Sequence, residues 1–493
     1  MRKITIPILL MLVACTPRIP ATFDSVDSVP VIFPDYTDVT IPGNIAPANF
    51  LIEEGADSYI TVLESKSAQA VIKGDKVKIP TRKWRKLTAA PEISIRVYGR
   101  NDKVWTAYQP FKLTVSDEID PYVSYRIIPV AVESYEKLSI RQRNLTNYDE
   151  KVIFANTMVE TNEEGTCINC HHYRNGETDN MMFHVRHFKG GTVLVLDGKL
   201  NKVNTKTDST ISAGSYPSWH PTHDYIAFAS DRIHQSVHAL SHDKLEVLDD
   251  NSDIILYDIR NNTVSPIEND TSQFECFPDW ASDGKSLFYV SATYQAPSGI
   301  PRRDAVFLDR FKFHYNLYSK PFDPDTHTWG ASRLLYDAVA SDSSVTWPKA
   351  SPDGRWLLCC ISSHGVFPLD QIESELIIFD LKDFSYRYAD ELNSPFAESF
   401  HCWSSNGKWL MFSTRREDGV HTRLYFSHID ENGHFSKPFA LPQRDPEFNR
   451  EFLNAFNIGE FMKEPVKITP WQFASFISST EATPSRYESK KEK

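Results

Sequence analysis

The residues of this sequence with the clearest chemical capacity are six consecutive ones, Cys167-Ile-Asn-Cys-His-His172. They contain the spacing C-x-x-C-H, which is typical of the attachment site of a c-type haem. Two thiols at this spacing can each add to a vinyl group of one porphyrin. The histidine that follows is then held against the iron, for which an imidazole nitrogen is a suitable ligand. The motif predicts a covalent haem c on Cys167 and Cys170, with His171 as the proximal iron ligand.

Two other interpretations of the cysteine pair stay open. The pair could form a disulfide or remain as thiols, or it could be half of a metal site. A structural zinc needs four ligands, and the sequence has no second C-x-x-C or C-x-x-H unit, so the site would have to recruit His172, His184 or His187. Only a haem gives a chemical reason for a histidine directly after the second cysteine.

The N-terminus predicts export and a lipid anchor. Arg2 and Lys3 precede a short apolar run, and Leu12-Val-Ala-Cys15 resembles a lipobox, the signal for bacterial lipoprotein processing. On this interpretation Cys15 is lipidated and residues 1–14 are removed; the alternative is an ordinary signal peptide with a chance cysteine. Thr16, in place of an aspartate, favours the outer membrane by analogy, and the absence of an acidic cluster directly after it favours the periplasmic face. Export agrees with the haem, because c-type haem is attached outside the cytoplasm in Gram-negative bacteria.

The composition limits which partners, membrane segments and disulfides the chain can have. The 493 residues carry a formal net charge of −12 without a basic patch, which argues against a nucleic-acid partner. No further segment reaches the roughly 18 apolar residues of a membrane span. Of the seven cysteines, four lie outside the haem motif and the lipobox, and we expect them to be buried free thiols: Cys276, Cys359, Cys360 and Cys402.

An internal repeat occupies residues 215–415. Its four copies begin at Tyr216, Phe277, Trp347 and Phe400, and each has an aromatic entry, a turn and an apolar strand. Three of the turns contain Asp-Gly or Asn-Gly, dipeptides that tolerate positive φ. Short strands that repeat every 50 to 70 residues, by a rough count, are typical of a β-propeller.

The P-x-W-S-P-D-G-like copies resemble the blades of the TolB-type β-propeller family over about residues 165–440. The whole chain resembles a group of bacterial lipoproteins that combine such a propeller with one C-x-x-C-H motif. The resemblance implies the fold and the haem but no settled activity. If the haem motif itself begins a blade, five blades are recognisable, within a total of five to seven. A sixth would be completed by chain before residue 165 or after residue 440.

The fold class is therefore expected to be all-β, with an N-terminal β-sandwich-like domain followed by a TolB-like β-propeller. Period-two patterns at 93–98 and 111–115 indicate strands in the first domain. The expected divisions are a signal peptide (1–14), a tether (15–29), the sandwich-like domain (30–119), a connector (120–164), the propeller with the haem loop (165–442), a C-terminal extension (443–477) and a disordered tail (478–493).

The ligand on the far side of the iron would decide the chemistry. Met182 and His184 lie two residues apart, so in a strand they share a face, and either is a candidate. Met raises the reduction potential and a second His lowers it. His187 is a further candidate. His238 is another, because it forms one stripe with His234 and His242 if residues 233–245 are helical; the alternative is a solvated loop.

A possible ligand contact lies in the last repeat copy. His401 stands where the other copies have a proline, and Arg415 and Arg416 follow in the same blade. Together they could bind an anionic group such as a haem propionate or a substrate carboxylate. The alternative is a buried, hydrogen-bonded histidine with two surface arginines.

Three functions follow. The first is an outer-membrane-anchored, periplasmic monohaem c-type cytochrome that transfers electrons to a redox or envelope protein partner. The second is a haem-based sensor or oxidoreductase with an open distal site. The third is a haem-free propeller lipoprotein that binds protein or glycan. The hydrolase, metalloprotease and phosphate-loop motifs G-x-S-x-G, H-E-x-x-H and G-x-x-x-x-G-K are absent, and the sequence does not decide whether the protein is an enzyme.

Overall fold

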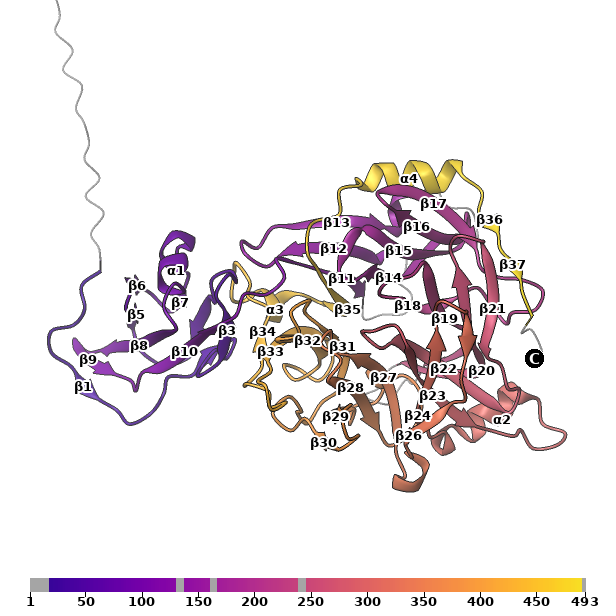
Figure 1. The fold of residues 1–493 in the computed structure, drawn as a ribbon. Helices are drawn as coiled ribbons and strands as arrows, with labels where there is room; N and C mark the ends of the chain where they lie inside the picture. Colours follow the sequence, from indigo (N-terminus) through magenta and orange to yellow (C-terminus); the bar gives the residue numbers. More distant parts are fainter. Residues whose placement is uncertain (1–16, 130–136, 160–165, 238–244, 490–493) are drawn as a thin grey trace, which may run out of the picture.

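The computed structural model describes residues 17–129, 137–159, 166–237 and 245–489. Figure 1 shows a small N-terminal β domain beside a larger ring of β-sheets, with few helices. The prediction of an all-β fold is confirmed. The described helices are α1 (Thr81–Leu87), α2 (Arg302–Leu308), α3 (Phe448–Glu451), α4 (Pro470–Ser479) and the short 3-10 turns η2 (Asn156–Met158), η3 (Arg310–Lys312), η4 (Val339–Ser341) and η5 (Pro368–Asp370).

The N-terminal domain consists of two sheets around one apolar core, as the period-two patterns predict. In β8, Ile93, Ile95 and Val97 alternate with more exposed residues and are buried in a cluster with Phe50 and Ile52 of the smaller sheet. The larger sheet contains β1 (Asp24–Ser25), β9 (Val104–Ala107), β8 (Glu92–Asn101), β10 (Phe111–Ser116), β3 (Thr40–Pro42), β5 (Ser58–Glu64) and β6 (Gln69–Lys73). The smaller contains β2 (Ile32–Phe33), β4 (Phe50–Ile52) and β7 (Lys76–Val77).

Six further sheets form a β-propeller. The innermost strand of each sheet contacts the innermost strands of the two neighbouring sheets, and the contact between β35 and β14 closes the ring. Blade 1 contains β35 (Asn454–Met462), β11 (Tyr122–Pro129), β12 (Ser139–Asn144) and β13 (Glu150–Ala155). Blade 2 contains β14 (Thr166–Arg174), β15 (Glu177–His187), β16 (Gly191–Leu196), β17 (Lys199–Asn204) and β36 (Thr483–Pro484). Blade 3 contains β18 (Ser215–Trp219), β19 (Tyr225–Val237), β20 (Leu245–Asp258), β21 (Thr263–Glu268) and β37 (Arg486–Tyr487).

The remaining three blades each come from one continuous stretch of chain. Blade 4 contains β22 (Gln273–Trp280), β23 (Ser286–Thr293), β24 (Asn316–Asp323), β25 (Thr328–Trp329) and β26 (Arg333–Tyr336). Blade 5 contains β27 (Ser344–Ala350), β28 (Trp356–Ser362), β29 (Glu375–Asp380) and β30 (Tyr386–Tyr388). Blade 6 contains β31 (Glu398–Trp403), β32 (Trp409–Thr414), β33 (Arg423–His428) and β34 (Phe439–Ala440).

Blade 1 differs from the expected domain divisions. The segment 120–164, expected as a connector, supplies its three outer strands, and 443–477, expected as an extension, supplies its innermost strand β35. Sharing one blade between two distant chain segments closes the ring and leaves no open inner edge. The repeat pattern does not reveal this blade, because β35 reads Asn-Ala-Phe-Asn-Ile-Gly-Glu-Phe-Met and has neither the proline nor the tryptophan, of which each of the four copies has at least one.

The C-terminal tail also differs from the expectation of disorder. Strands β36 and β37 pair in parallel with the outer strands of blades 2 and 3, and Figure 1 shows them along that rim. Ser485 N donates to the Asn204 carbonyl oxygen at 3.0 Å, and Glu488 N donates to that of Val264 at 2.8 Å. The tail is poor in apolar residues, but these contacts need only its backbone.

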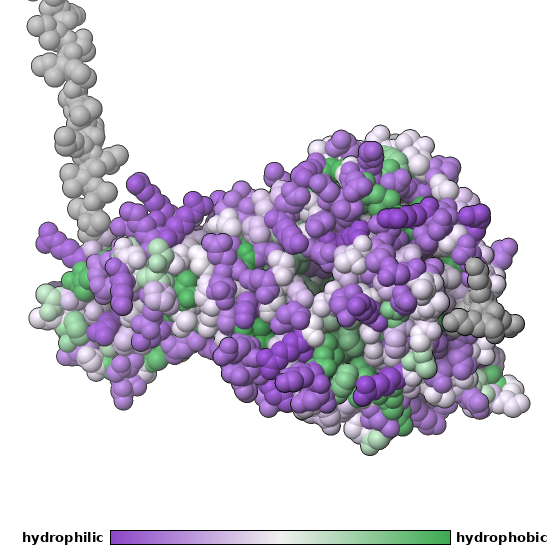
Figure 2. Space-filling view, viewed as in Figure 1, coloured by the Kyte–Doolittle hydropathy of each residue, from purple (hydrophilic) through white to green (hydrophobic). Residues whose placement is uncertain are grey.

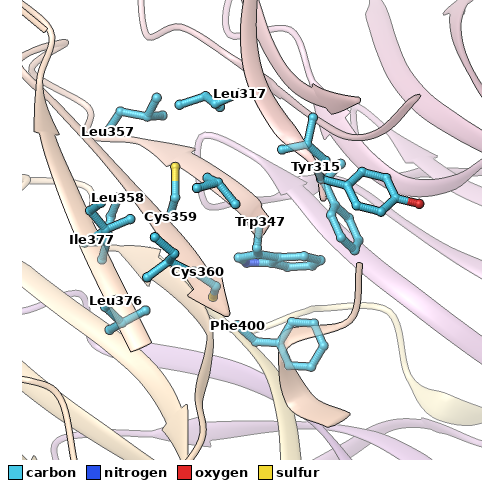
Figure 3. Close-up of a cluster of buried hydrophobic side chains, with 14 of the residues drawn as sticks. Tyr315, Leu317, Trp347, Leu357, Leu358, Cys359, Cys360, Leu376, Ile377 and Phe400 are labelled. Carbon is cyan, nitrogen blue, oxygen red and sulfur yellow. The ribbon is translucent and has the colours of Figure 1, made fainter. Parts of the chain in front are cut away.

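A dense apolar core lies between the last three blades. Figure 3 shows part of it, with Cys359 and Cys360 among leucines and isoleucines near Trp347. Both thiols are fully buried, and Cys276 is 2% exposed, so these cysteines are buried free thiols as expected; Cys402 is only partly buried.

The sandwich domain packs directly on blades 1 and 6. Trp409 of blade 6 lies in the apolar cluster of the sandwich domain, and its Nε1 donates to the Asp117 carbonyl oxygen at 3.1 Å. Hydrophilic side chains cover most of the face in Figure 2, with apolar residues in small groups. Among the described residues, no helix is long and apolar enough to cross a membrane.

Candidate functional site

Each innermost strand of the propeller carries one residue in a left-handed conformation. The pairing with the next strand shifts register at each of these residues, as in a β-bulge. The six residues, with φ between 42° and 51°, are Cys170, Tyr216, Phe277, Trp347, Phe400 and Ile458. We call them the bulge ring. A small cavity inside the propeller is lined by five of them, so their side chains point toward the axis.

Four aromatic members of the bulge ring fill the middle of the channel. Ring centroids are 4.7 Å apart for Tyr216 and Phe277, 5.1 Å for Phe277 and Trp347, and 4.7 Å for Trp347 and Phe400. The edge-to-face angles are those that aromatic pairs prefer. This plug separates two ends of the channel: one beside Cys167, before the bulge, and one beside His172, after it.

The C-x-x-C-H motif lies in the innermost strand of blade 2. Strand β14 begins at Thr166, and Cys170 occupies the bulge position where other blades have a large apolar residue. His171 takes the place of Pro217, Pro278 and Pro348. The motif therefore begins a blade, as expected, but it is part of a strand and not of a separate loop.

His171 has the features of a ligand without a partner. Its side chain is 1% exposed, and neither ring nitrogen has a hydrogen-bond partner among the described residues. Burial lowers its pKa to about 4, with Glu460 opposing the shift, so the imidazole is neutral at pH 7. A neutral imidazole is the form that binds iron. These properties fit the proximal ligand of a haem.

Both thiols of the motif lie near two guanidinium groups. Cys167 and Cys170 each act electrostatically on Arg126 of blade 1 and on Arg186 of β15. The pairing of Cys167 with Arg186 across β14 and β15 accounts for part of this arrangement. Burial raises the pKa of Cys167, against the effect of the two guanidiniums.

Met182 and His184 share a face, but it is not that of His171. In the β14–β15 pairing His171 lies opposite Phe183, between these two residues in sequence. Successive residues of a strand point to opposite faces. His184 Nδ1 contacts Thr192 Oγ1 at 2.9 Å, and burial lowers its pKa to about 3. Neither residue is positioned to complete an iron site with His171, so the structure does not support them as distal ligands.

The other histidine candidates are also separated from the motif. His238 and His242 lie outside the described residues. His234 lies in β19, paired with Leu248 of β20, so the helical stripe that would align the three is wrong in its described part. His187 ends β15 on the exposed surface, opposite Thr166. Cys15 lies outside the described residues as well.

His401 and Arg416 do not combine into an anion site. His401 is 1% exposed; its Nε2 contacts the Leu358 carbonyl oxygen at 2.8 Å, and burial lowers its pKa to about 3. Arg416 is paired with the buried Glu398 at 2.9 Å. Burial raises the pKa of Glu398 to about 7, with Arg416 opposing the shift. Arg415 is held in place by its backbone N, which donates to the Ala397 carbonyl oxygen at 3.1 Å.

The opposite end of the channel has a cavity that sequence reasoning missed. Its volume is about 420 Å³, and two close pairs of side chains line it: His172 Nδ1 lies 3.0 Å from Glu460, and Lys349 forms an ion pair with Asp279 at 2.8 Å. These four residues stand two positions after the bulge in their strands. From the sequence, these positions could be found only by aligning the blades. Glu460 could not be found even so, because β35 does not show the repeat pattern.

The fold and the channel define a six-bladed β-propeller protein with an N-terminal sandwich domain. Similar solved structures include TolB from Acinetobacter baumannii (12% identity, 78% of this chain and 85% of that chain, TM-score 0.44). An oligogalacturonate lyase in complex with manganese (12%, 69% and 86%, 0.30) and Kuenenia stuttgartiensis hydrazine synthase (10%, 52% and 63%, 0.28) are also similar. The chain matches no protein-family model and no curated protein sequence.

Proposed function

We propose that this protein carries one covalent haem c on the C-x-x-C-H motif of β14 and transfers single electrons in the cell envelope. The observation that carries the proposal is His171, an almost fully buried imidazole whose two nitrogens have no hydrogen-bond partner in the described part of the chain. Leaving a buried polar group unpaired costs about 1–3 kcal/mol. A bound iron would satisfy one of the two ring nitrogens.

The residues of the motif would divide the work. Cys167 and Cys170 would hold the porphyrin through thioether bonds, and His171 would bind the iron in its neutral form. When bound, the haem supplies one-electron chemistry between ferric and ferrous iron. The buried position of His171 keeps it neutral near pH 7, so no proton has to leave before it binds.

The proposed function also includes a localisation at the outer membrane and a protein partner. Lipidation at Cys15 would anchor the chain to the periplasmic face of the outer membrane, in the compartment where c-type haem is attached. The partner would be a redox or envelope protein, because a carrier with one haem must pass its electron on.

A second candidate function is a haem-based sensor or oxidoreductase. The position of Met182 and His184 on the face opposite His171 favours it, because neither then fills the distal side of the iron. The two candidates share the haem and differ in whether the sixth iron position exchanges ligands. A haem-free protein that binds a partner at the 420 Å³ cavity remains the third hypothesis.

An absorption spectrum tests the proposal. The full chain is expressed with a cytochrome c maturation system, purified, and extracted with acid–acetone. We expect the haem to stay with the polypeptide and to be lost from the double variant Cys167→Ser/Cys170→Ser. Cys402→Ser is the matched control, since Cys402 is also a partly buried cysteine on an innermost strand. It should keep the haem.

Carbon monoxide added to the reduced protein then separates the two haem functions. A spectral shift indicates an exchangeable distal position and favours the sensor or oxidoreductase; no shift favours the electron carrier. A colourless wild-type protein, or haem that extracts fully from it, would contradict both.

A further inference from the structure

The larger sheet of the sandwich domain has two faces, and the domain core covers one of them. In β8, alternate residues from Ile93 to Val97 belong to the core, so Arg96, Tyr98 and Arg100 point to the opposite face. Residues directly opposite each other in neighbouring strands share a face. The register therefore adds alternate residues of β5, β6 and β9 to this side of the sheet. We call it the outer face of the sandwich sheet.

The outer face carries apolar side chains. A cluster separate from the domain core consists of Ile60, Val62, Tyr98 and Ala107. Trp105 lies partly buried against it. Phe23, just before the edge strand β1, packs on Tyr98 with ring centroids 5.2 Å apart and is still 40% exposed. A sheet face that meets only water normally carries polar residues, so this face has the character of a contact surface.

The same face carries an excess of positive charge. The register places three cations on it, Lys73, Arg96 and Arg100, and none of them forms an ion pair within the described part of the chain. Arg100 instead lies over the Trp105 ring, 5.6 Å from its centroid. Glu64 is the carboxylate on this face that has no cationic partner among the described residues. The positive excess stands out in a chain whose formal net charge is −12.

The undescribed N-terminal segment does not neutralise this charge, since residues 1–16 contain no aspartate or glutamate. The propeller does not cover Phe23 either. Figure 1 shows β1 and β9 at the end of the sandwich domain away from the propeller. The contacts between the two domains lie elsewhere, among them Lys78 with Asp445 at 2.9 Å.

The outer face lies close to the predicted lipid anchor. Eight residues of chain separate Cys15 from Phe23. In any conformation they span at most about 30 Å. A lipid on Cys15 would therefore hold this face beside the membrane surface.

We propose that the outer face of the sandwich sheet docks on an anionic phospholipid surface. Exposed aromatic side chains enter the headgroup region, and unpaired cations attract anionic lipids. This inference deepens the lipid anchor of the proposed function and rests on it for location. With the sheet against the membrane, the propeller, which packs on other residues of the sandwich, extends into the aqueous compartment.

Vesicle binding tests the proposal on residues 16–493, which carry no lipid and include every described residue. The chain is sedimented with vesicles of equal amounts of phosphatidylethanolamine and phosphatidylglycerol. We expect binding that weakens with added salt and is much weaker on pure phosphatidylcholine. Phe23→Ser/Arg100→Gln should lower the partition coefficient by about tenfold, because it removes one cation and one exposed ring.

Two further double variants make the test specific. Val71→Ser/Lys73→Gln changes the same face through β6, away from the β1 edge, and should weaken binding by a similar factor. Leu308→Ser/Arg303→Gln is the matched control, because it removes an exposed apolar residue and an exposed cation from α2 of the propeller. It should leave binding unchanged.

Two results would overturn the docking face. The first is a wild-type chain that does not bind the anionic vesicles, which would leave a protein as the occupant. The second is an equal loss of binding in all three double variants, which would make the binding a general effect of charge. The assay needs neither haem nor a lipid on Cys15. Failure of the proposed function is seen separately, in the absorption spectrum and in the mass of the exported N-terminus.

Discussion

Replacing Asp249 with asparagine should stabilise the protein at neutral pH. Asp249 lies in β20 and is 5% exposed; Ser252 Oγ donates to its Oδ2 at 2.6 Å, and its Oδ1 has no partner among the described residues. Burial, and then the charge of Asp231, raise its pKa to about 8. The folded protein therefore holds this carboxyl group protonated at pH 7.

The sign of the effect follows from the raised pKa. The stability that protonated Asp249 contributes is fully present below its pKa in the unfolded chain, about 4. It is lost as the pH rises through its pKa in the folded protein, about 8. At about 1.4 kcal/mol for each pKa unit, ionisation of the Asp249 carboxyl group in the unfolded chain favours unfolding by about 4 kcal/mol at pH 7. Asparagine has nearly the same shape as the protonated acid and does not ionise. We expect Asp249→Asn to gain about 2–4 kcal/mol at pH 7 and almost nothing at pH 4.

Urea unfolding at both pH values, followed by tryptophan fluorescence, measures this difference. Asp279→Asn is the control: Asp279 is 7% exposed but is paired with Lys349 and accepts from Ala350 N at 2.9 Å, so its replacement should destabilise the protein at pH 7. Equal loss of stability at both pH values in Asp249→Asn would refute the reasoning, because the charged carboxylate would then be the form that the fold needs.

Three further outcomes are expected from the packing of the propeller. Trp347→Ala should cost about 3–5 kcal/mol in urea unfolding because it opens the aromatic plug, whereas Trp471→Ala, at a residue 73% exposed, should be nearly neutral. Truncation after Thr480 should lower the free energy of unfolding by about 1–3 kcal/mol, since it removes three backbone bonds between the tail and blades 2 and 3. Arg416→Met should cost about 3 kcal/mol at pH 8, where it leaves the Glu398 carboxylate unpaired, and much less at pH 5, where Glu398 is protonated; a loss that is independent of pH would contradict this.

The propeller could be predicted from sequence because its blades repeat a local signal. The aromatic entries at Tyr216, Phe277, Trp347 and Phe400 are the bulge residues of their strands, and in the last three copies a glycine turn follows seven residues later. The closing blade could not be predicted in this way, because its strands come from opposite ends of the propeller sequence. Strand β13 ends at Ala155 and β35 begins at Asn454, so no local pattern connects them.

In the candidate site, too, the residues of a local motif could be predicted and those from distant segments could not. The motif Cys167, Cys170 and His171 is local and could be found from spacing alone. Arg126 and Glu460 lie beside it only because blade 1 is built from two distant segments, and nothing in their neighbouring residues indicates it. The shared face of Met182 and His184 was predicted correctly, but which face could not be known, because the bulge at Cys170 shifts the register of β14 by one residue.

Blade 2 differs from the other blades at the bulge ring. Five ring positions carry large apolar side chains, and the sixth is the small Cys170; the cavity that Cys170 lines together with four of the large residues has a volume of only about 20 Å³. The position after the bulge is proline or glycine in four blades and histidine in two, and His401 is hydrogen-bonded where His171 has no partner among the described residues. Blade 2 thus combines two thiols with a buried imidazole that has no hydrogen-bond partner among the described residues. A bound group, as proposed above, would give these residues a role, because a buried unpaired imidazole by itself costs stability.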